Sequence, residues 1–200
     1  MTDKEWRQKI ARMIMVGFRE AEVDRETPVV RAIRDFGLGG VILYNIDLKG
    51  FLAARKENPA LDRIQAARLC PKNILSRGQL KALTSALQGV SKVPLLIAVD
   101  QEGGMVSRLG PAAGFPERPS LRTLGEKDDL RTTAEAAGGM AQDLRESGIN
   151  LNLAPVVDLD LNPQSPIARL GRSFGSDPGL VCRHARAFIQ AHRGKGVLTA

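Results

Sequence analysis

The sequence predicts an α/β fold built on a parallel sheet. Two observations carry this prediction. Segments with apolar residues at helical spacing alternate along the chain with short apolar runs, which is the order expected of β/α units. The runs at 41–44 and 95–99 are apolar on both faces, and strands buried on both faces are typical of parallel sheets. A doubly wound sheet and a closed barrel both fit this pattern.

The first half of the chain is predicted to hold three helices and two strands. Helical spacing of apolar residues places the helices at roughly residues 3–17, 28–36 and 77–90. Thr27 and Pro28 mark the second helix start, because a capping residue followed by proline favours helix initiation. The strands are residues 41–44 and 95–99. Residues 46–75 show little regular pattern and are expected to form a long loop with one short helix.

The second half is predicted to hold two helices and two strands. A long loop over about residues 100–127 precedes an amphipathic helix and then a third strand near residues 150–157. Asp177 and Pro178 begin the last helix. Residues 197–200 form a fourth strand, and we expect the chain to be truncated within it.

Nucleic-acid binding is not predicted, although the formal net charge is +7 from 29 Lys+Arg and 22 Asp+Glu. Basic residues alternate with acidic ones almost everywhere, as in residues 126–129. Aromatic residues make up only 4% of the chain, so side chains on which bases could stack are scarce. The charge is therefore interpreted as a solvated, arginine-rich surface.

The cysteines and histidines do not indicate a metal site. Cys70 and Cys182 are the only cysteines, and two distant cysteines make neither a disulfide framework nor a ligand cluster. His184 and His192 lie on the last predicted helix without further metal ligands at suitable spacing. We interpret both histidines as surface residues.

The sequence also lacks the features of a membrane protein. No stretch approaches the roughly 18 apolar residues of a membrane span. The first residues lack the charged start, apolar run and cleavage site of a signal peptide. We therefore expect a cytoplasmic protein without a membrane partner; its oligomeric state is not predicted.

Polar residues follow three of the predicted strands. Asn45 follows the first, Asp100 and Glu102 follow the second, and Asp158 and Asp160 follow the third. Each could singly be a turn starter or a helix cap. Their repetition at three strand ends favours a site for hydroxyl-rich or cationic ligands, since barrel enzymes build their sites at that edge.

A nucleotide-binding loop is not indicated. A dinucleotide fingerprint requires glycines that follow a strand and open a helix. Gly37, Gly39 and Gly40 precede a strand, whereas Gly103 and Gly104 follow one but begin a long loop.

Four segments resemble family 3 glycoside hydrolases. Residues 95–104 (LLIAVDQEGG) resemble the signature strand and loop of the family, closest to its bacterial β-N-acetylhexosaminidase-like branch. Residues 39–43 resemble the first barrel strand, 152–158 the third, and 172–178 the loop and helix start beyond it. The resemblance covers nearly the whole chain. It implies a (β/α)8 TIM-type barrel of which residues 1–200 form the N-terminal half, with about four strands.

The resemblance implies hydrolysis of O-glycosidic bonds by a retaining β-N-acetylhexosaminidase-like enzyme acting on cell-wall or related glycans, as in peptidoglycan turnover. A retaining mechanism uses a carboxylate nucleophile and an acid/base group, and no cofactor. In the family these groups follow the strand on which this sequence ends. We therefore expect no catalytic residue in this chain and no turnover by the chain alone.

The resemblance also implies roles for five residues. Asp100 is expected to accept hydrogen bonds from substrate hydroxyls. Arg108 and Arg172 are expected to bind substrate through their planar guanidinium groups. Glu102 and Asp158 are expected to support the site. Asp100 and Glu102 are not interpreted as a catalytic pair, and without the resemblance both arginines could be surface residues.

Two other classes of function stay open. One is a non-catalytic sugar-binding half barrel that pairs with another chain. The other is an unrelated barrel enzyme that binds phosphate.

Overall fold

The computed structural model describes residues 2–200, apart from the side chains of Lys4, Arg63 and Ile64. Helices and strands alternate, and the main strands pair in parallel, which confirms the predicted α/β fold. The chain forms two compact units. The first extends to Ala98 and includes Ala112–Gly114, and the second consists of Val99–Pro111 and Phe115–Ala200.

Three parallel strands form the sheet of the first unit, in the order β1, β2, β3. They are Met15–Gly17, Gly40–Ile42 and Leu96–Val99, and the last residue of β3 belongs to the second unit. Val41 pairs with Val16 on one side and with Ile97 on the other. Val41 and Ile97 are fully buried, as expected of a parallel strand covered on both faces.

Local capping residues mark the start or end of several helices of the first unit. Ser76 begins α5, because its hydroxyl accepts a hydrogen bond from the Gln79 amide at 3.2 Å. Gly37 ends the second helical segment in the left-handed region, with φ of 74°. The helical segments are α1 Asp3–Ala11, α2 Pro28–Arg31 continued by the π-helix η1 Ala32–Phe36, α3 Leu48–Glu57, α4 Arg63–Leu69 and α5 Arg77–Val90.

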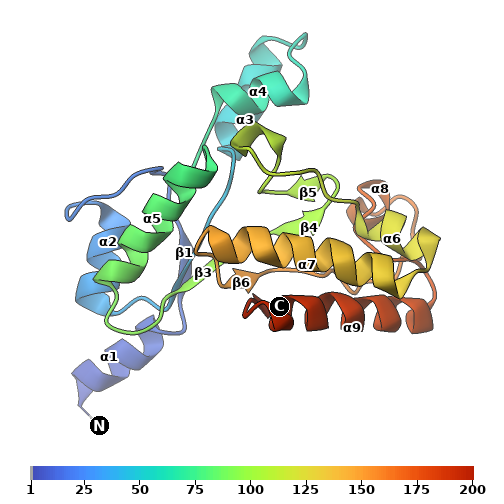
Figure 1. Ribbon diagram of the computed structural model, residues 1–200. Helices are drawn as coiled ribbons and strands as arrows, with labels where there is room; N and C mark the ends of the chain where they lie inside the picture. The colour runs from blue at the N-terminus through green and yellow to red at the C-terminus, as the bar shows by residue number, and fades with distance from the viewer. Residues whose placement is uncertain (1) are drawn as a thin grey trace. The chain divides into compact units, whose positions relative to one another are not determined.

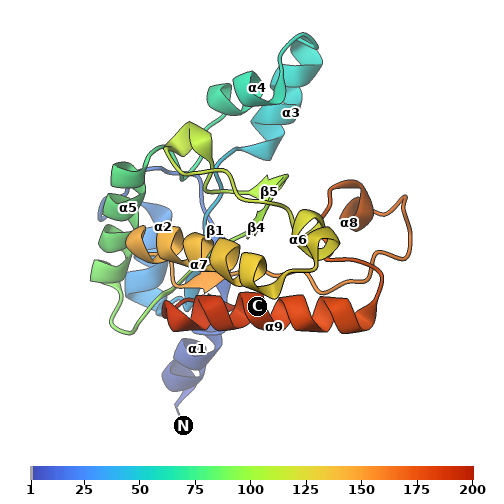
Figure 2. The same cartoon turned by 45° about the vertical axis from the view of Figure 1, so that its right-hand side comes forward.

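Two predictions for the first unit were wrong. The helix predicted over residues 3–17 ends at Ala11, and β1 follows it; the Gly40 amide donates to the Ile14 carbonyl at 3.2 Å. Pairing with β2 thus overrides a pattern that also fitted a helix. Residues 46–75 contain two helices, α3 and α4, which Figure 2 shows side by side.

The second unit contains a hairpin, a parallel strand pair and four α-helices. In the parallel pair, Leu151 lies opposite Leu198 and Asn152 opposite Thr199. Helices α7 and α9 run side by side (Figure 1). The elements are β4 Gln101–Gly103, β5 Val106–Ser107, the 3-10 helix η2 Pro111–Ala113 shared with the first unit, α6 Leu121–Lys127, α7 Leu130–Glu146, β6 Leu151–Asn152, α8 Pro166–Arg169, α9 Pro178–Gly194 and β7 Leu198–Thr199.

The core of the second unit lies between helices α6, α7 and α9 and the segment that follows β6. Phe174 and Phe188 are its largest buried side chains. The core consists of Leu121, Leu124, Ala137, Met140, Ala154, Phe174, Val181, Ala185 and Phe188. Burying this apolar surface fixes the loops around it, because each large apolar side chain contributes about 1.5–3 kcal/mol on burial.

The second unit confirms some predictions and corrects others. The last helix begins at Pro178, and the Asp177 carboxylate accepts from the Leu180 amide at 2.8 Å. The loop predicted over 100–127 contains the β4–β5 hairpin and α6, and the third predicted strand shortens to β6. The predicted fourth strand is β7. Among residues 2–200 it is the fifth strand that pairs in parallel, and not the fourth, because β1 was not predicted.

The prediction that both histidines lie on the surface was also wrong. His184 and His192 are fully buried. They lie on the same face of α9 as Val181, Ala185 and Phe188, at helical spacing. This spacing was visible in the sequence and indicated burial. No helix within residues 2–200 is long and apolar enough to cross a membrane.

Candidate substrate site

The β4–β5 hairpin brings Asp100 and Arg108 together. Asp100 lies directly between β3 and β4, and the register places Gln101 opposite Ser107. The hairpin therefore returns the chain to Asp100 eight residues later. The Arg108 guanidinium donates to Asp100 Oδ2 from Nη2 at 2.9 Å and from Nε at 3.3 Å. Both side chains remain about a quarter exposed, at 24% and 23%.

Glycine makes this hairpin possible. Gly103 has a φ of +89°, in the region that side-chain-bearing residues rarely adopt. A Cβ atom on Gly103 would also collide with the carbonyl oxygen of Pro119. The Gly104 amide donates to the Arg118 carbonyl at 2.9 Å, which holds the turn against the following loop.

Glu102 forms a second, more buried pair with Arg172. Arg172 donates from Nε to Glu102 Oε2 at 2.9 Å and from Nη2 to Oε1 at 2.7 Å. The Glu102 side chain is 3% exposed and that of Arg172 is 28% exposed. Both carboxylate oxygens are thus occupied by one guanidinium, in the bidentate geometry that suits arginine.

The loop that carries Arg172 is held by its own hydrogen bonds. The Arg172 amide donates to the Ile167 carbonyl at 2.9 Å. The buried Ser173 hydroxyl donates to the Asp158 carbonyl at 2.6 Å. The segment after α8 is therefore tied to the segment after β6.

The electrostatics of Arg172 place Asp100 and Asp158 near it. The hydrogen bond to Glu102 raises the pKa of Arg172, and the charges of Glu102, Asp100 and Asp158 raise it further. Asp158 is exposed, and its carboxylate accepts no hydrogen bond from the described residues. The structure thus brings together the residues that we call the acid–arginine cluster: Asp100, Glu102, Arg108, Asp158 and Arg172.

The cluster offers both an acceptor and a donor to a ligand. Asp100 uses only Oδ2 toward Arg108, and Arg172 uses Nε and Nη2 toward Glu102. Within residues 2–200, Asp100 Oδ1 and Arg172 Nη1 have no hydrogen-bond partner. A carboxylate oxygen accepts from a hydroxyl, and a guanidinium N–H donates to a hydroxyl or carbonyl oxygen. Glu102, in contrast, is too enclosed to act on a ligand.

Three buried residues support the cluster and were not singled out from the sequence. The Gln101 side chain donates to Ser107 Oγ at 2.8 Å and accepts from the Leu109 amide at 2.9 Å, which fixes the hairpin. Asn152 hydrogen-bonds to the Gln101 backbone and to His192. Asn152 lies in a segment of the family resemblance, and His192 lies on an apolar helix face. The sequence therefore contained an indication that each of them is important.

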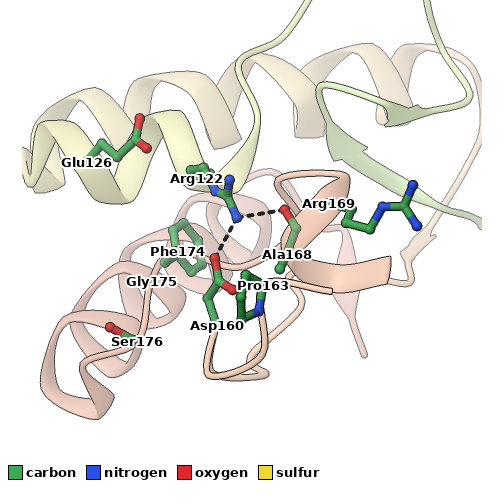
Figure 3. A pocket seen from close by; sticks show the side chains of 9 residues that line it. All are labelled: Arg122, Glu126, Asp160, Pro163, Ala168, Arg169, Phe174, Gly175 and Ser176. Atoms are coloured by element: carbon green, nitrogen blue, oxygen red, sulfur yellow. Dashed lines mark hydrogen bonds and ion pairs between the residues drawn. The ribbon is translucent and has the colours of Figure 1, made fainter. Parts of the chain in front are cut away.

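A pocket of about 470 Å³ is lined by none of the five residues of the acid–arginine cluster (Figure 3). Arg122 crosses it and donates from Nη2 to Asp160 Oδ2 at 2.5 Å and to the Ala168 carbonyl at 2.6 Å. Asp160 thus forms an ion pair with Arg122 in the wall of this pocket and is not part of the acid–arginine cluster. The pocket is lined by Arg122, Glu126, Asp160, Pro163, Ala168, Arg169, Phe174, Gly175 and Ser176.

No group of three His, Cys, Asp or Glu side chains within the described part of the chain could hold a metal ion. Cys70 and Cys182 are free thiols.

Parallel β/α units with polar side chains after a strand end have the arrangement of β/α barrels, whose enzymes build their sites at that edge. Residues 5–200 match the glycosyl hydrolase family 3 N terminal domain, and the chain belongs to this family. It is 36% identical to beta-hexosaminidase A of Pseudoalteromonas piscicida over 145 residues, which are 68% of this chain and 24% of that protein. It is 38% identical to the beta-hexosaminidase of Bordetella avium over 128 residues, which are 61% of this chain and 36% of that protein.

A solved structure supports the same assignment. The structure of a glycoside hydrolase family 3 beta-N-acetylglucosaminidase from Paenibacillus sp. matches with a TM-score of 0.78 and 29% identity. The match covers 100% of this chain and 32% of that chain. The chain thus spans between a quarter and about a third of these relatives.

Proposed function

We propose that the acid–arginine cluster binds an N-acetylhexosamine unit of a glycan, and that the protein hydrolyses β-linked N-acetylhexosaminides. One observation carries the proposal. Two acid–arginine pairs lie together beyond the carboxyl end of β3, and in each pair at least one partner is about a quarter exposed. That edge of a parallel β/α fold is where barrel enzymes bind their substrates.

In each pair one residue contacts the sugar and its partner holds it in position. Asp100 accepts a hydrogen bond from a sugar hydroxyl through Oδ1, while Arg108 holds its other oxygen in place. Arg172 donates through Nη1 to a sugar oxygen, while Glu102 fixes the plane of its guanidinium. Asp158 adds an exposed carboxylate beside Arg172. Charge-assisted bonds of this kind contribute about 1.5–3 kcal/mol each.

We do not assign cleavage of the glycosidic bond to Asp100 or Glu102. A retaining glycosidase needs a nucleophilic carboxylate and an acid/base group about 5–5.5 Å from it, on opposite faces of the sugar. Both oxygens of Glu102 accept from Arg172 and its side chain is only 3% exposed, so Glu102 is enclosed rather than presented to a substrate. Asp100 and Glu102 therefore bind and support, and we assign no catalytic role within residues 1–200.

The substrate that we propose is a cell-wall-derived glycan, and the process is peptidoglycan turnover in the cytoplasm. The beta-hexosaminidase names of the curated relatives support the sugar class. Cell fractionation tests the compartment. Saturable binding of purified muropeptides tests the substrate, because no turnover is expected of residues 1–200 alone, and a lack of binding would contradict it.

Titration of the 15N-labelled protein with N-acetylglucosamine tests the binding role. We expect saturable shifts at Asp100, Arg108 and Arg172, and about tenfold or greater weakening in Asp100→Asn, since a charge-assisted bond is lost. Asp35→Asn is the control, because Asp35 pairs with Arg34 in the first unit. Shifts elsewhere, or saturation only by a sugar phosphate, would contradict the proposal and favour a phosphate-binding barrel.

A further inference from the structure

A buried asparagine holds the backbone between the two acidic residues of the site. Asn152 in β6 is fully buried. Its Oδ1 accepts from the Gln101 amide at 3.0 Å, and its Nδ2 donates to the Gln101 carbonyl at 3.0 Å. One side-chain amide thus satisfies both backbone groups of Gln101. Since Asp100 and Glu102 flank Gln101, this pair of bonds also sets where their backbones lie.

A buried histidine, together with the two backbone groups of Gln101, fixes which way that amide faces. Asn152 Nδ2 lies 3.0 Å from His192 Nε2, and His192 Nδ1 lies 3.1 Å from the Phe188 carbonyl. The carbonyl can only accept, so Nδ1 carries the imidazole proton and Nε2 is left as an acceptor. The NH2 group of Asn152 must then face His192. The opposite amide orientation would set an oxygen against Nε2 and against the Gln101 carbonyl.

The surroundings of His192 keep it in this state. Its ring stacks on Phe188, with 4.4 Å between ring centroids and 16° between the planes. Burial lowers the pKa of His192 to about 4, so the imidazole is neutral at neutral pH. Phe188 belongs to the core of the second unit. The ring is therefore fixed by packing, and its two nitrogens are fixed by hydrogen bonds.

We propose that His192 is a positioning residue for substrate binding, because it orients the Asn152 amide that holds the backbone between Asp100 and Glu102. The proposal rests on the function proposed above for these two carboxylates. His192 touches no ligand. It acts through Asn152 and Gln101, so its loss changes sugar affinity without removing any group that contacts the sugar.

Two substitutions on the same helix separate positioning from general stability. His192→Phe keeps a ring over Phe188 but removes the acceptor for Asn152. His184→Phe is the matched control, because His184 is also fully buried on α9 and stacks on Phe174, yet it bonds Thr133 and Asp128 instead. His192→Gln returns an acceptor oxygen on a side chain of similar reach.

The measurements are sugar affinity and NMR signals of the protein with N-acetylglucosamine as the probe. In His192→Phe we expect about tenfold weaker binding, comparable to one lost hydrogen bond, together with shifted amide signals of Gln101 and Glu102. We expect His192→Gln to regain most of the affinity. His184→Phe should lower stability but leave the affinity and these amide signals unchanged.

The outcomes distinguish the two proposals. Unchanged affinity and unchanged Gln101 and Glu102 signals in His192→Phe would overturn the positioning role. If the wild-type protein does not bind the sugar, the proposed function is contradicted. The amide signals of Gln101 and Glu102 in His192→Phe then still test whether His192 positions this backbone. If His192→Phe does not fold, the tautomer of His192 in the wild-type protein tests the positioning role instead. Long-range 15N–1H spectra must place the proton on Nδ1, and a proton on Nε2 would overturn the proposal.

Discussion

Arg172 contacts Glu102 through two hydrogen bonds of 2.9 and 2.7 Å, although 70 residues separate them in the sequence. The pair joins β4 to the loop after α8, so the two halves of the candidate site are held by one ion pair. Glu102 is 3% exposed, and both of its carboxylate oxygens accept from this single guanidinium. The pair therefore connects the stability of the second unit with the geometry of its site.

Removing Arg172 should destabilise the protein strongly. Arg172→Ala leaves the Glu102 carboxylate buried without a partner, and breaking a buried pair in this way costs about 3–5 kcal/mol. Arg131→Ala is the control, because Arg131 and Glu135 form an exposed pair on α7. Such pairs contribute about 0.5 kcal/mol or less. Urea unfolding of both variants measures the difference, and equal losses would contradict the role given to the Glu102 pair.

Stability should fall on mild acidification because of His192. Its pKa is lowered by burial from 6.5 to about 4, so between these values the unfolded chain binds a proton that the folded protein does not. The free energy of unfolding should be unaffected above pH 6.5 and decrease by about 3 kcal/mol as the pH falls toward 4. His192→Gln should remove this part of the slope. The same slope in both proteins over pH 4–6.5 would contradict the assignment.

Two glycines should respond in opposite directions to substitution by alanine. A Cβ atom on Gly125 in α6 would collide with the Phe174 carbonyl, so Gly125→Ala should cost about 1–3 kcal/mol or more. Gly138 lies within α7 with open space around the same position. Gly138→Ala should stabilise by about 0.5–1 kcal/mol, because alanine has the higher helix propensity. Thermal unfolding tests both, and a stabilising Gly125→Ala would show that α6 does not pack as closely as described.

Asn73 should be important for the loops of the first unit. It is fully buried, accepts from the Tyr44 amide at 3.0 Å, and donates to the carbonyls of Phe18 at 3.2 Å and Glu20 at 2.9 Å. Asn73→Leu would leave these backbone groups without partners, at a cost of about 2–4 kcal/mol. Asn58→Ala, at an exposed helix end, should change stability by about 0.5 kcal/mol or less. A small loss in Asn73→Leu would mean that water replaces the side chain.

Much of the fold could be predicted because its signals are local. The helices at 77–90 and 178–194 begin at Ser76 and Asp177, whose side chains accept from nearby amides. The strand at 95–99 was recognisable because both of its faces are apolar. The residues of the acid–arginine cluster were named from their places in the family resemblance. The structure brings them together, while their roles toward a sugar stay predictions.

The errors arose where long-range pairing decides between local alternatives. Residues 15–17 fitted the end of a helix as well as a strand, and only pairing with Gly40–Ile42 makes them β1. His184 and His192 were interpreted as surface residues because no further metal ligands lie at suitable spacing beside them. Their position on an apolar helix face, with partners at Thr133 and Asn152, buries them instead.

The sequence by itself determined the α/β class, the family, the helices with strong caps and the polar residues at the strand ends. These follow from residue types within a few positions of one another. Only the tertiary structure decided that Asp100 pairs with Arg108 and Glu102 with Arg172, and that His192 orients Asn152 behind them. Such partners are set by how the hairpin, the loop after α8 and helix α9 pack around one core. The contacts span eight residues for Asp100 and Arg108, 40 for Asn152 and His192, and 70 for Glu102 and Arg172, and none of them leaves a periodic pattern in the sequence.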